Sequence, residues 1–387
     1  MRLTDTVTSQ LFSPLTLRSV TTRNRLWVSP LCQYSVTAAD GVPTDWHLVH
    51  LGSFARGGAG MVMAEATAVV PEGRISPHDT GIWNDEQAAA WSRIVSFIHS
   101  QGAAAGIQLA HAGRKASVYP EWGATAAGYS GQGTMPESEG GWTPLAPSAI
   151  AFEGYATPHA LDAAGIAAVV EAFRAGARRA VDAGFDLVEV HAAHGYLLHE
   201  FLSPLSNTRT DEWGGSLENR ARLMLDIVRA VRAEVGDDVP VLVRFSASDW
   251  VDDEWLAEHG HVDDGVAGWD EQQTATVAAW ALEAGADLFD ISSGGLVRAR
   301  IATGPGYQVP FAEHVRREGK VPVSAVGLIT QAQQAEDILA AGQADAIMMG
   351  REFMRDPHTP LRFARELGVE ADGVPVSTPP QYLRAYR

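Results

Sequence analysis

Short apolar runs alternate with Ala-rich amphipathic stretches along most of the chain, and the boundary between them recurs in one form. At residues 183–186, 284–287 and 341–345, an Ala-rich stretch ends in Ala-Gly, and an aspartate follows just before an apolar run. Glycine tolerates the left-handed backbone that ends many helices. A short apolar run is typical of a strand buried on both faces of a parallel sheet. The joint therefore predicts repeated helix-to-strand units.

Looser copies of this unit extend the pattern to eight strands. Strands are predicted at residues 26–31, 60–64, 104–109, 187–190, 239–245, 288–291, 321–326 and 346–349. Helices are predicted at residues 85–101, 162–183, 217–235, 270–284 and 331–341. Eight strands alternating with helices favour an α/β fold, a closed (β/α)8 TIM barrel forming a single domain over residues 1–387. An open doubly wound sheet is the alternative, but no Gly-x-Gly-x-x-Gly motif follows the first strand.

One segment interrupts this rhythm. Residues 115–159 are rich in Gly, Pro, Ser and Trp and have little periodicity. Because the segment follows the third strand, we expect it to lie over the mouth of the barrel. We interpret it as a lid that shapes a substrate pocket, and a passive insertion is the alternative.

Composition narrows the class of protein. Cys32 is the single cysteine among 387 residues, so neither an intramolecular disulfide nor a cysteine-ligated iron–sulfur cluster can form. Arg18, Arg23 and Arg25 interrupt the N-terminal region where a signal peptide would be apolar, and no later run is long enough for a membrane span. The net charge of −18 argues against nucleic-acid binding. We expect a cytoplasmic protein.

Chemistry in a barrel of this kind sits at the C-terminal ends of the strands. Reading these ends in order gives a polar ring: residues 29–32, Glu65 and Ala66, Gln108 and His111, His191 and His194, Arg244, residues 292–295, Gly327, and Gly350 with Arg351. The ring has few paired carboxylates, which disfavours glycosidase chemistry.

The last two strand ends predict a phosphate site. Gly327 follows the seventh predicted strand, and Gly350 and Arg351 follow the eighth. Glycine lets backbone N–H groups approach an anion, and arginine supplies a forked cation. A helix cap with a surface arginine is the alternative.

His191, His194 and Tyr196 form the most informative cluster. Two imidazoles three residues apart can donate hydrogen bonds to one oxygen and stabilise the enolate-like charge that follows hydride attack. Tyr196 can then act as a general acid. Two alternatives stay open at this point: a metal site completed by His199 and Glu200, or purely structural histidines. No second group of ligands at metal-binding spacing stands out elsewhere.

Several motifs resemble the Old Yellow Enzyme family of NADH:flavin oxidoreductases. The family signature is matched by EVHAAHGY at residues 189–196 and EWGGSLENR at residues 212–220. SPLCQY at residues 29–34, QLAHAGRK at residues 108–115 and PGYQ at residues 305–308 resemble its thermophilic-like branch. The resemblance extends from residue 11 to the C-terminus.

The resemblance implies a tightly bound, non-covalent FMN. The residues it assigns to the flavin are Ser29, Pro30, Leu31, Cys32, Ala66, Gln108, Arg244, Gly327, Gly350 and Arg351. It implies that Cys32 lies near flavin N5, that Arg244 lies near N1 and the C2 carbonyl, and that Arg351 holds the phosphate with Gly350. A small buried hydrophobe is the alternative for Cys32, and a structural ion pair for Arg244.

The resemblance also implies the roles of the substrate-binding residues. His191 and His194 would hold the substrate oxygen, and Tyr196 would donate a proton. Tyr34 would contact the substrate; an ordinary half-buried aromatic is the alternative. Arg384, in the tail at residues 375–387, would enter the site of a neighbouring subunit in a homodimer or homotetramer, and a free terminal charge is its alternative.

The expected reaction is that of an ene-reductase. NADPH, or NADH, reduces FMN, and hydride then passes to the β-carbon of an activated alkene, an α,β-unsaturated carbonyl or nitro compound. A flavin-free barrel lyase or isomerase acting on a phosphorylated substrate is the alternative. Such an enzyme would typically need a Schiff-base lysine or a catalytic carboxylate at a strand end, and the sequence offers neither.

Overall fold

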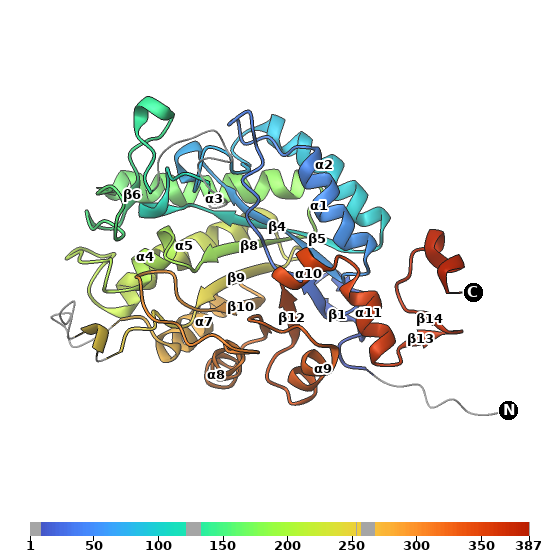
Figure 1. Cartoon of the computed structure of the whole chain (residues 1–387). Coiled ribbons are helices and arrows are strands. Elements are labelled where there is room, and N and C mark those ends of the chain that lie inside the picture. Colours follow the sequence, from blue (N-terminus) through green and yellow to red (C-terminus); the bar gives the residue numbers. More distant parts are fainter. Residues whose placement is uncertain (1–8, 121–132, 253, 257–267, 387) are drawn as a thin grey trace.

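Eight parallel strands close into a barrel in the computed structural model, which describes residues 9–120, 133–252, 254–256 and 268–386 (Figure 1). The strands are β3 (Leu26–Val28), β4 (Met61–Ala68), β5 (Ala104–Ala110), β8 (Leu187–Ala192), β9 (Val241–Ser246), β10 (Leu288–Ser292), β11 (Val323–Ala325) and β12 (Ala346–Met349). They follow one another around the barrel in chain order, and β12 pairs with β3. The predicted (β/α)8 fold is confirmed.

Helices lie around the outside of this barrel (Figure 1). They are α1 (Asp45–Arg56), α2 (Asp85–Ser100), α3 (Ala163–Asp182), α4 (Leu197–Leu202), α5 (Leu217–Val235), α7 (Glu271–Ala284), α8 (Val309–Gly319), α9 (Ala332–Ala340), α10 (Arg351–Arg355) and α11 (Thr359–Glu366). All five predicted helices are present, whereas α1, α4, α8, α10 and α11 were not among the predicted ranges. Side-chain caps start several of them; Asn84, for example, accepts from the backbone N–H of Gln87 at 2.9 Å.

The repeated joints have a physical cause. Their glycines have left-handed backbones, for example Gly184 with a φ of 97°. Each aspartate then accepts a backbone N–H at the start of the neighbouring strand. The three bonds are Ala105 to Asp186 at 2.7 Å, Val241 to Asp287 at 2.8 Å, and Val323 to Asp345 at 3.0 Å. The aspartates therefore fix the register between adjacent strands.

The largest departures from the predicted strands are two that are shorter than expected and one that is longer. The first ends at Val28 and the seventh covers only Val323–Ala325, because the residues that follow leave the sheet to line a cavity. β4 continues to Ala68 through a register shift between Ala64 and Ala66. This irregularity places Ala66 opposite Gln108.

An N-terminal hairpin that was not predicted covers one end of the barrel. It consists of β1 (Leu15–Leu17) and β2 (Val20–Thr22). Leu15 and Leu17 pack against a buried cluster formed by strand residues, namely Trp27, Met61, Met63, Leu187, Leu242, Leu288, Ala346 and Met348. This apolar filling leaves the C-terminal ends of the strands as the place for a site.

The segment predicted as a lid carries little regular structure. β6 (Leu145–Ala146) pairs with β7 (His159–Ala160), and residues 121–132 lie outside the described part. Its described side chains Trp142 and Tyr155 join an apolar cluster that includes Cys32 and Tyr196. The lid role and the single-domain division stay predictions.

The chain ends with a small hairpin, β13 (Glu370–Ala371) and β14 (Val374–Pro375), and the short helix η4 (Pro380–Ala385), beside α11 (Figure 1). Three further short helices are η1 (Pro71–Gly73), η2 (Gly113–Lys115) and η3 (Glu137–Glu139). Within the described residues, none of the helices combines the length and apolar character needed to cross a membrane.

Candidate active site

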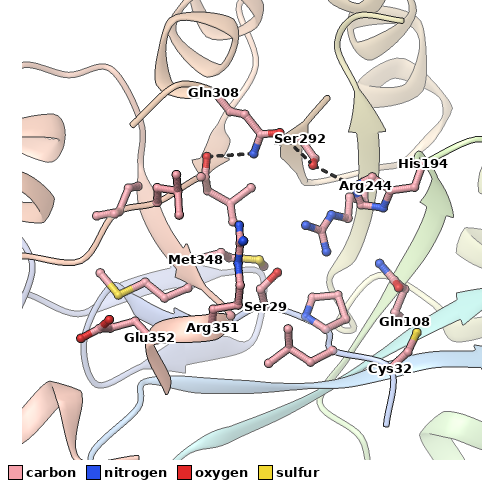
Figure 2. A pocket seen from close by; sticks show the side chains of 18 of the residues that line it. Ser29, Cys32, Gln108, His194, Arg244, Ser292, Gln308, Met348, Arg351 and Glu352 are labelled. Carbon is pink, nitrogen blue, oxygen red and sulfur yellow. Dashed lines mark hydrogen bonds between the residues drawn. The ribbon is translucent and has the colours of Figure 1, made fainter. Parts of the chain in front are cut away.

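A cavity of about 240 Å³ opens at the C-terminal ends of the barrel strands (Figure 2). It collects most of the residues that the sequence predicted for a site: Ser29, Pro30, Leu31, Cys32, Gln108, His191, His194, Tyr196, Arg244, Gly327, Gly350 and Arg351. These residues come from six of the eight strand ends. The cavity therefore lies at the strand ends, where the sequence predicts a site.

Three predicted site residues do not line this cavity. Ala66 is buried in β4, where it pairs with the cavity residue Gln108. Tyr34 is buried with a φ of 50° and packs in the same apolar cluster as Cys32 and Tyr196. Arg384 is exposed in η4. Its side chain is therefore outside the cavity of its own chain.

His191, His194 and Tyr196 lie together at the end of β8. The ring centroid of His191 is 5.2 Å from that of His194 and 5.2 Å from that of Tyr196. The turn between them requires glycine at position 195, which has a φ of 70°. A Cβ there would lie 2.2 Å from the carbonyl oxygen of Gly295. The close approach of these two loops fixes where Tyr196 stands.

Both imidazoles are neutral. Burial, and after it the charge of Arg244, lowers the pKa of His191 and of His194 well below its usual range. Nε2 of His194 is 2.8 Å from Oγ of Ser292, and Nδ1 of His191 is buried with no hydrogen-bond partner in the described part of the chain. A neutral His191 can donate one hydrogen bond to a ligand oxygen, and His194 can do so when the Ser292 hydroxyl donates to its Nε2 instead of to Gln308.

The neighbouring groups that a metal site would have required are engaged elsewhere. Nε2 of His199 is 3.1 Å from Oδ1 of Asp249, and its Nδ1 accepts the backbone N–H of Gly195. Glu200 accepts the backbone N–H of Arg114 at 2.8 Å. Among the residues that the structure describes, no group of three His, Cys, Asp or Glu side chains is arranged to hold a metal ion.

Two buried carboxyl groups lie on strands beside Arg244. Oδ2 of Asp290 is 3.0 Å from Nε of Arg244, and Glu189 accepts a hydrogen bond from Gln108 at 2.7 Å. Burial, and after it Asp290, raises the pKa of Glu189 to about 8. We place the proton on Glu189, because Asp290 has the cation as its partner. The sequence did not reveal these two groups, since each sits inside an apolar strand.

One side of the cavity is suited to an anion. Arg351 has no acidic partner among the described residues, and Gly327 and Gly350 lie nearby in the lining. In contrast, Arg355 is paired with Glu352 at 2.6 Å. Figure 2 shows Arg351 on the opposite side of the cavity from Gln108 and Cys32. A ligand with a phosphate at one end would span this distance.

Gln308, for which no role was predicted, lines the cavity. Its amide accepts from Ser293 at 2.7 Å and donates to the carbonyl oxygen of Val326 at 3.2 Å. It also accepts from Ser292, the partner of His194. The motif at residues 305–308 was the available signal. Gln308 ties the ends of β10 and β11 together behind the histidines.

The family model of the NADH:flavin oxidoreductase / NADH oxidase family matches residues 10–370. The chain belongs to this family, that of the Old Yellow Enzymes. An NADPH dehydrogenase of Geobacillus thermodenitrificans is 45% identical over 378 residues, which is 97% of this chain and 98% of the relative. The protein is therefore an oxidoreductase, as predicted.

Solved structures agree with this Old Yellow Enzyme assignment. Morphinone reductase is 30% identical, with a TM-score of 0.73, over 97% of this chain and 94% of that one. The Old Yellow Enzyme homologue from Zymomonas mobilis is 27% identical, with a TM-score of 0.71, over 98% and 99%. The flavin-free lyase alternative thereby loses its basis.

Members of the Old Yellow Enzyme family use FMN, with NAD(P)H as the reductant, and the cavity fits this cofactor. Arg351 offers the phosphate a cation that has no acidic partner among the described residues, and the apolar side chains of Pro30 and Leu31 suit a flat ring. Gln108 and Arg244 supply polar groups for the ring edge. The cavity therefore offers binding groups for both ends of FMN, the phosphate and the ring.

Proposed function

We propose that this flavin oxidoreductase is an ene-reductase that uses NAD(P)H, with NADPH preferred, to reduce activated alkenes. The observation that carries the proposal is the grouping of two neutral imidazoles, His191 and His194, with the phenol of Tyr196 beside a cavity that suits FMN. A plain flavin-binding module would not need these three groups together.

His191 and His194 would act on the carbonyl or nitro oxygen of the substrate. Each neutral ring can donate one N–H to that oxygen, which withdraws electron density from the conjugated double bond. Because the rings are neutral before substrate binds, they stabilise the developing negative charge as hydrogen-bond donors and bring no full positive charge of their own. Bound FMN, once reduced by NAD(P)H, supplies the hydride for the β-carbon.

Tyr196 would complete the reduction. Its phenol transfers a proton to the α-carbon of the substrate, and the phenolate then recovers a proton from water. The position of Tyr196 is fixed by the turn at Gly195, and its backbone carbonyl oxygen accepts from the N–H of Glu200 at 2.9 Å. A fixed donor of this kind is what stereospecific protonation needs.

The test is the Tyr196→Phe variant in anaerobic rapid-mixing experiments. Flavin reduction by NADPH should change little, because it requires no protonation of carbon. Reoxidation of the reduced enzyme by an enone should slow by roughly a hundredfold or more. Equal slowing of both half-reactions, or no slowing of either, would contradict the assignment of Tyr196.

We further propose a homodimer or homotetramer in which Arg384 enters the neighbouring site. Its exposure in η4, away from its own cavity, supports a contact in trans. The Arg384→Ala variant should raise KM for an anionic or carbonyl substrate while light scattering shows an unchanged mass. An unchanged KM would refute the role.

A further inference from the structure

Lys115 holds its ammonium group against the ring of Tyr196. The residue ends η2, in the loop that follows β5. Its Nζ is 5.0 Å from the centroid of the Tyr196 ring and 4.9 Å from that of Phe152. Nζ also donates to the carbonyl oxygens of His194 at 2.8 Å and Gly295 at 3.0 Å. These bonds fix the cation in place between the two rings.

A fixed cation over a phenol ring changes the chemistry of that phenol. Negative charge in a phenolate spreads into the ring, so a positive charge about 5 Å from the ring favours the phenolate over the phenol. We propose that Lys115 is a positioning residue that makes the Tyr196 phenol a stronger acid, and therefore a faster proton donor to the alkene substrate. The rate part of this inference rests on the proposed ene-reductase function.

Among the described residues, Lys115 is the cation that contacts the ring of Tyr196. The charged and titratable side chains at this end of the cavity come from several elements: Arg114 and Lys115 on η2, His191 on β8, His194 in the turn after it, Glu200 and the Asp249-paired His199 on α4, Cys32 and Tyr34 after β3, and Arg244 on β9. Both histidines are neutral, as described above. Burial raises the pKa of Glu200 to about 8, so this carboxyl is largely protonated at neutral pH. Arg114 donates to the carbonyl oxygen of Leu296.

The same charge already acts on neighbouring groups. After burial and other groups, Lys115 contributes to lowering the pKa of His191 and of His194, and it opposes the rise that burial causes in the pKa of Glu200. Its field therefore reaches the reacting end of the cavity. Lys115 would thus favour both the neutral state of the imidazoles and the acidity of the phenol.

The direct test is a titration of Tyr196 in the FMN-loaded enzyme by NMR of tyrosine labelled with ¹³C at Cζ. The chain has 8 tyrosines, and the Tyr196 resonance is the one that disappears in Tyr196→Phe. In Lys115→Met, the midpoint of that titration should move up by about one pH unit or more. Lys115→Arg, which keeps a positive charge, should move it less.

Arg298→Met is the matched control. The guanidinium of Arg298 lies 5.9 Å from the ring centroid of Phe152, the ring that Lys115 also contacts. Among the described residues, Arg298 makes no such contact with the ring of Tyr196. Removing this charge should leave the Tyr196 midpoint in place. If Lys115→Met loses FMN, Lys115→Gln carries the same test, because an amide retains a donor for the carbonyl oxygens while the charge is lost.

A kinetic test follows from the pH dependence of the enone half-reaction. A phenolate cannot donate, so the rate should fall at alkaline pH as Tyr196 ionises. In Lys115→Met, the plateau should drop several-fold and the alkaline limb should move to higher pH. In a Tyr196→Phe background, Lys115→Met should have almost no further effect.

Three results would overturn the inference. One is an unmoved Tyr196 midpoint in Lys115→Met, and another is an equal shift in Arg298→Met. The third is a rate that drops uniformly at every pH, which a merely structural role for Lys115 would give. If Tyr196 is not the proton donor, the NMR midpoint still moves while the rate profile does not. The failure of the proposed function is therefore distinguishable.

Discussion

Replacing Arg351 with methionine should weaken FMN binding through the phosphate alone. Arg351 lines the cavity, and it has no carboxylate partner in the described part of the chain. Its guanidinium can therefore bind an anion without first breaking an ion pair. Methionine keeps much of the side-chain volume and removes the charge, so the variant isolates the electrostatic contribution.

The magnitude follows from the kind of bond that is lost. A hydrogen bond to a charged group contributes about 1.5–3 kcal/mol. Since each 1.4 kcal/mol is a factor of ten, the dissociation constant for FMN should rise roughly tenfold to a hundredfold. Arg355→Met is the matched control, because that arginine is already paired with Glu352 at 2.6 Å and is largely exposed. Arg355 also lines the cavity, but its charge is exposed to solvent and offset by Glu352, so its attraction for the phosphate should be about 0–1 kcal/mol, as for other exposed charges, and the control should change the affinity for FMN by less than about fivefold.

The assay is titration of apoprotein with FMN and, separately, with riboflavin, which has no phosphate. Wild-type protein should prefer FMN, and Arg351→Met should lose most of that preference while its affinity for riboflavin stays nearly constant. The reasoning is refuted if Arg351→Met weakens both ligands equally, or if Arg355→Met has the larger effect on FMN.

Two further predictions concern stability. Gly195→Ala should lower the melting temperature by several degrees, because a Cβ would lie 2.2 Å from the carbonyl oxygen of Gly295. Gly304→Ala is the control and should change the melting temperature little, because nothing lies within 4 Å of a Cβ there. Equal effects of the two substitutions would contradict this reasoning. Asp79 accepts the N–H of Ile75 at 2.6 Å, and burial, and after it Glu65, raises its pKa from 3.8 to about 7. Because folding raises this pKa, the protonated carboxyl stabilises the folded state at pH values below the pKa of the unfolded chain. This stabilisation is lost as the pH rises to 7, by as much as roughly 4 kcal/mol. The melting temperature of Asp79→Asn should therefore gain on the wild type between pH 5 and pH 8 in thermal scans, and a constant difference would refute it.

The barrel could be predicted from the sequence because its repeating joint depends on local chemistry. Glycine at position 184 adopts a left-handed backbone, and Asp186 binds an N–H of the adjacent strand. Both requirements recur wherever a helix returns to a strand. Once eight strands were identified, their C-terminal ends gave most of the cavity lining without any knowledge of side-chain positions.

Elements with a blurred apolar pattern were not predicted. Helix α1 exposes Trp46 and Val49 and has Gly52 in its interior, so its apolar positions do not form one clear face. Its capping box also uses His47 in place of the usual Glu or Gln. Local sequence therefore gave a weak signal for a helix that the structure places firmly.

Parts of the site that depend on distant pairs could not be predicted either. Glu189 and Asp290 look like interruptions in apolar strands until Arg244 is seen on the strand between them. Lys115 likewise gains meaning only from Tyr196, which belongs to another strand end. Spacing along the chain carries no information on such contacts, because they arise from closure of the barrel.

Met348 belongs both to the buried cluster inside the barrel and to the cavity lining (Figure 2). The same side chain thus separates the packed interior of the barrel from the cavity. A shorter residue here would deepen the pocket by removing material that the strands pack against. A substitution of Met348 that makes room for a bulkier ligand therefore also weakens the packing of the barrel. The loops that follow the strands are the safer place to alter specificity.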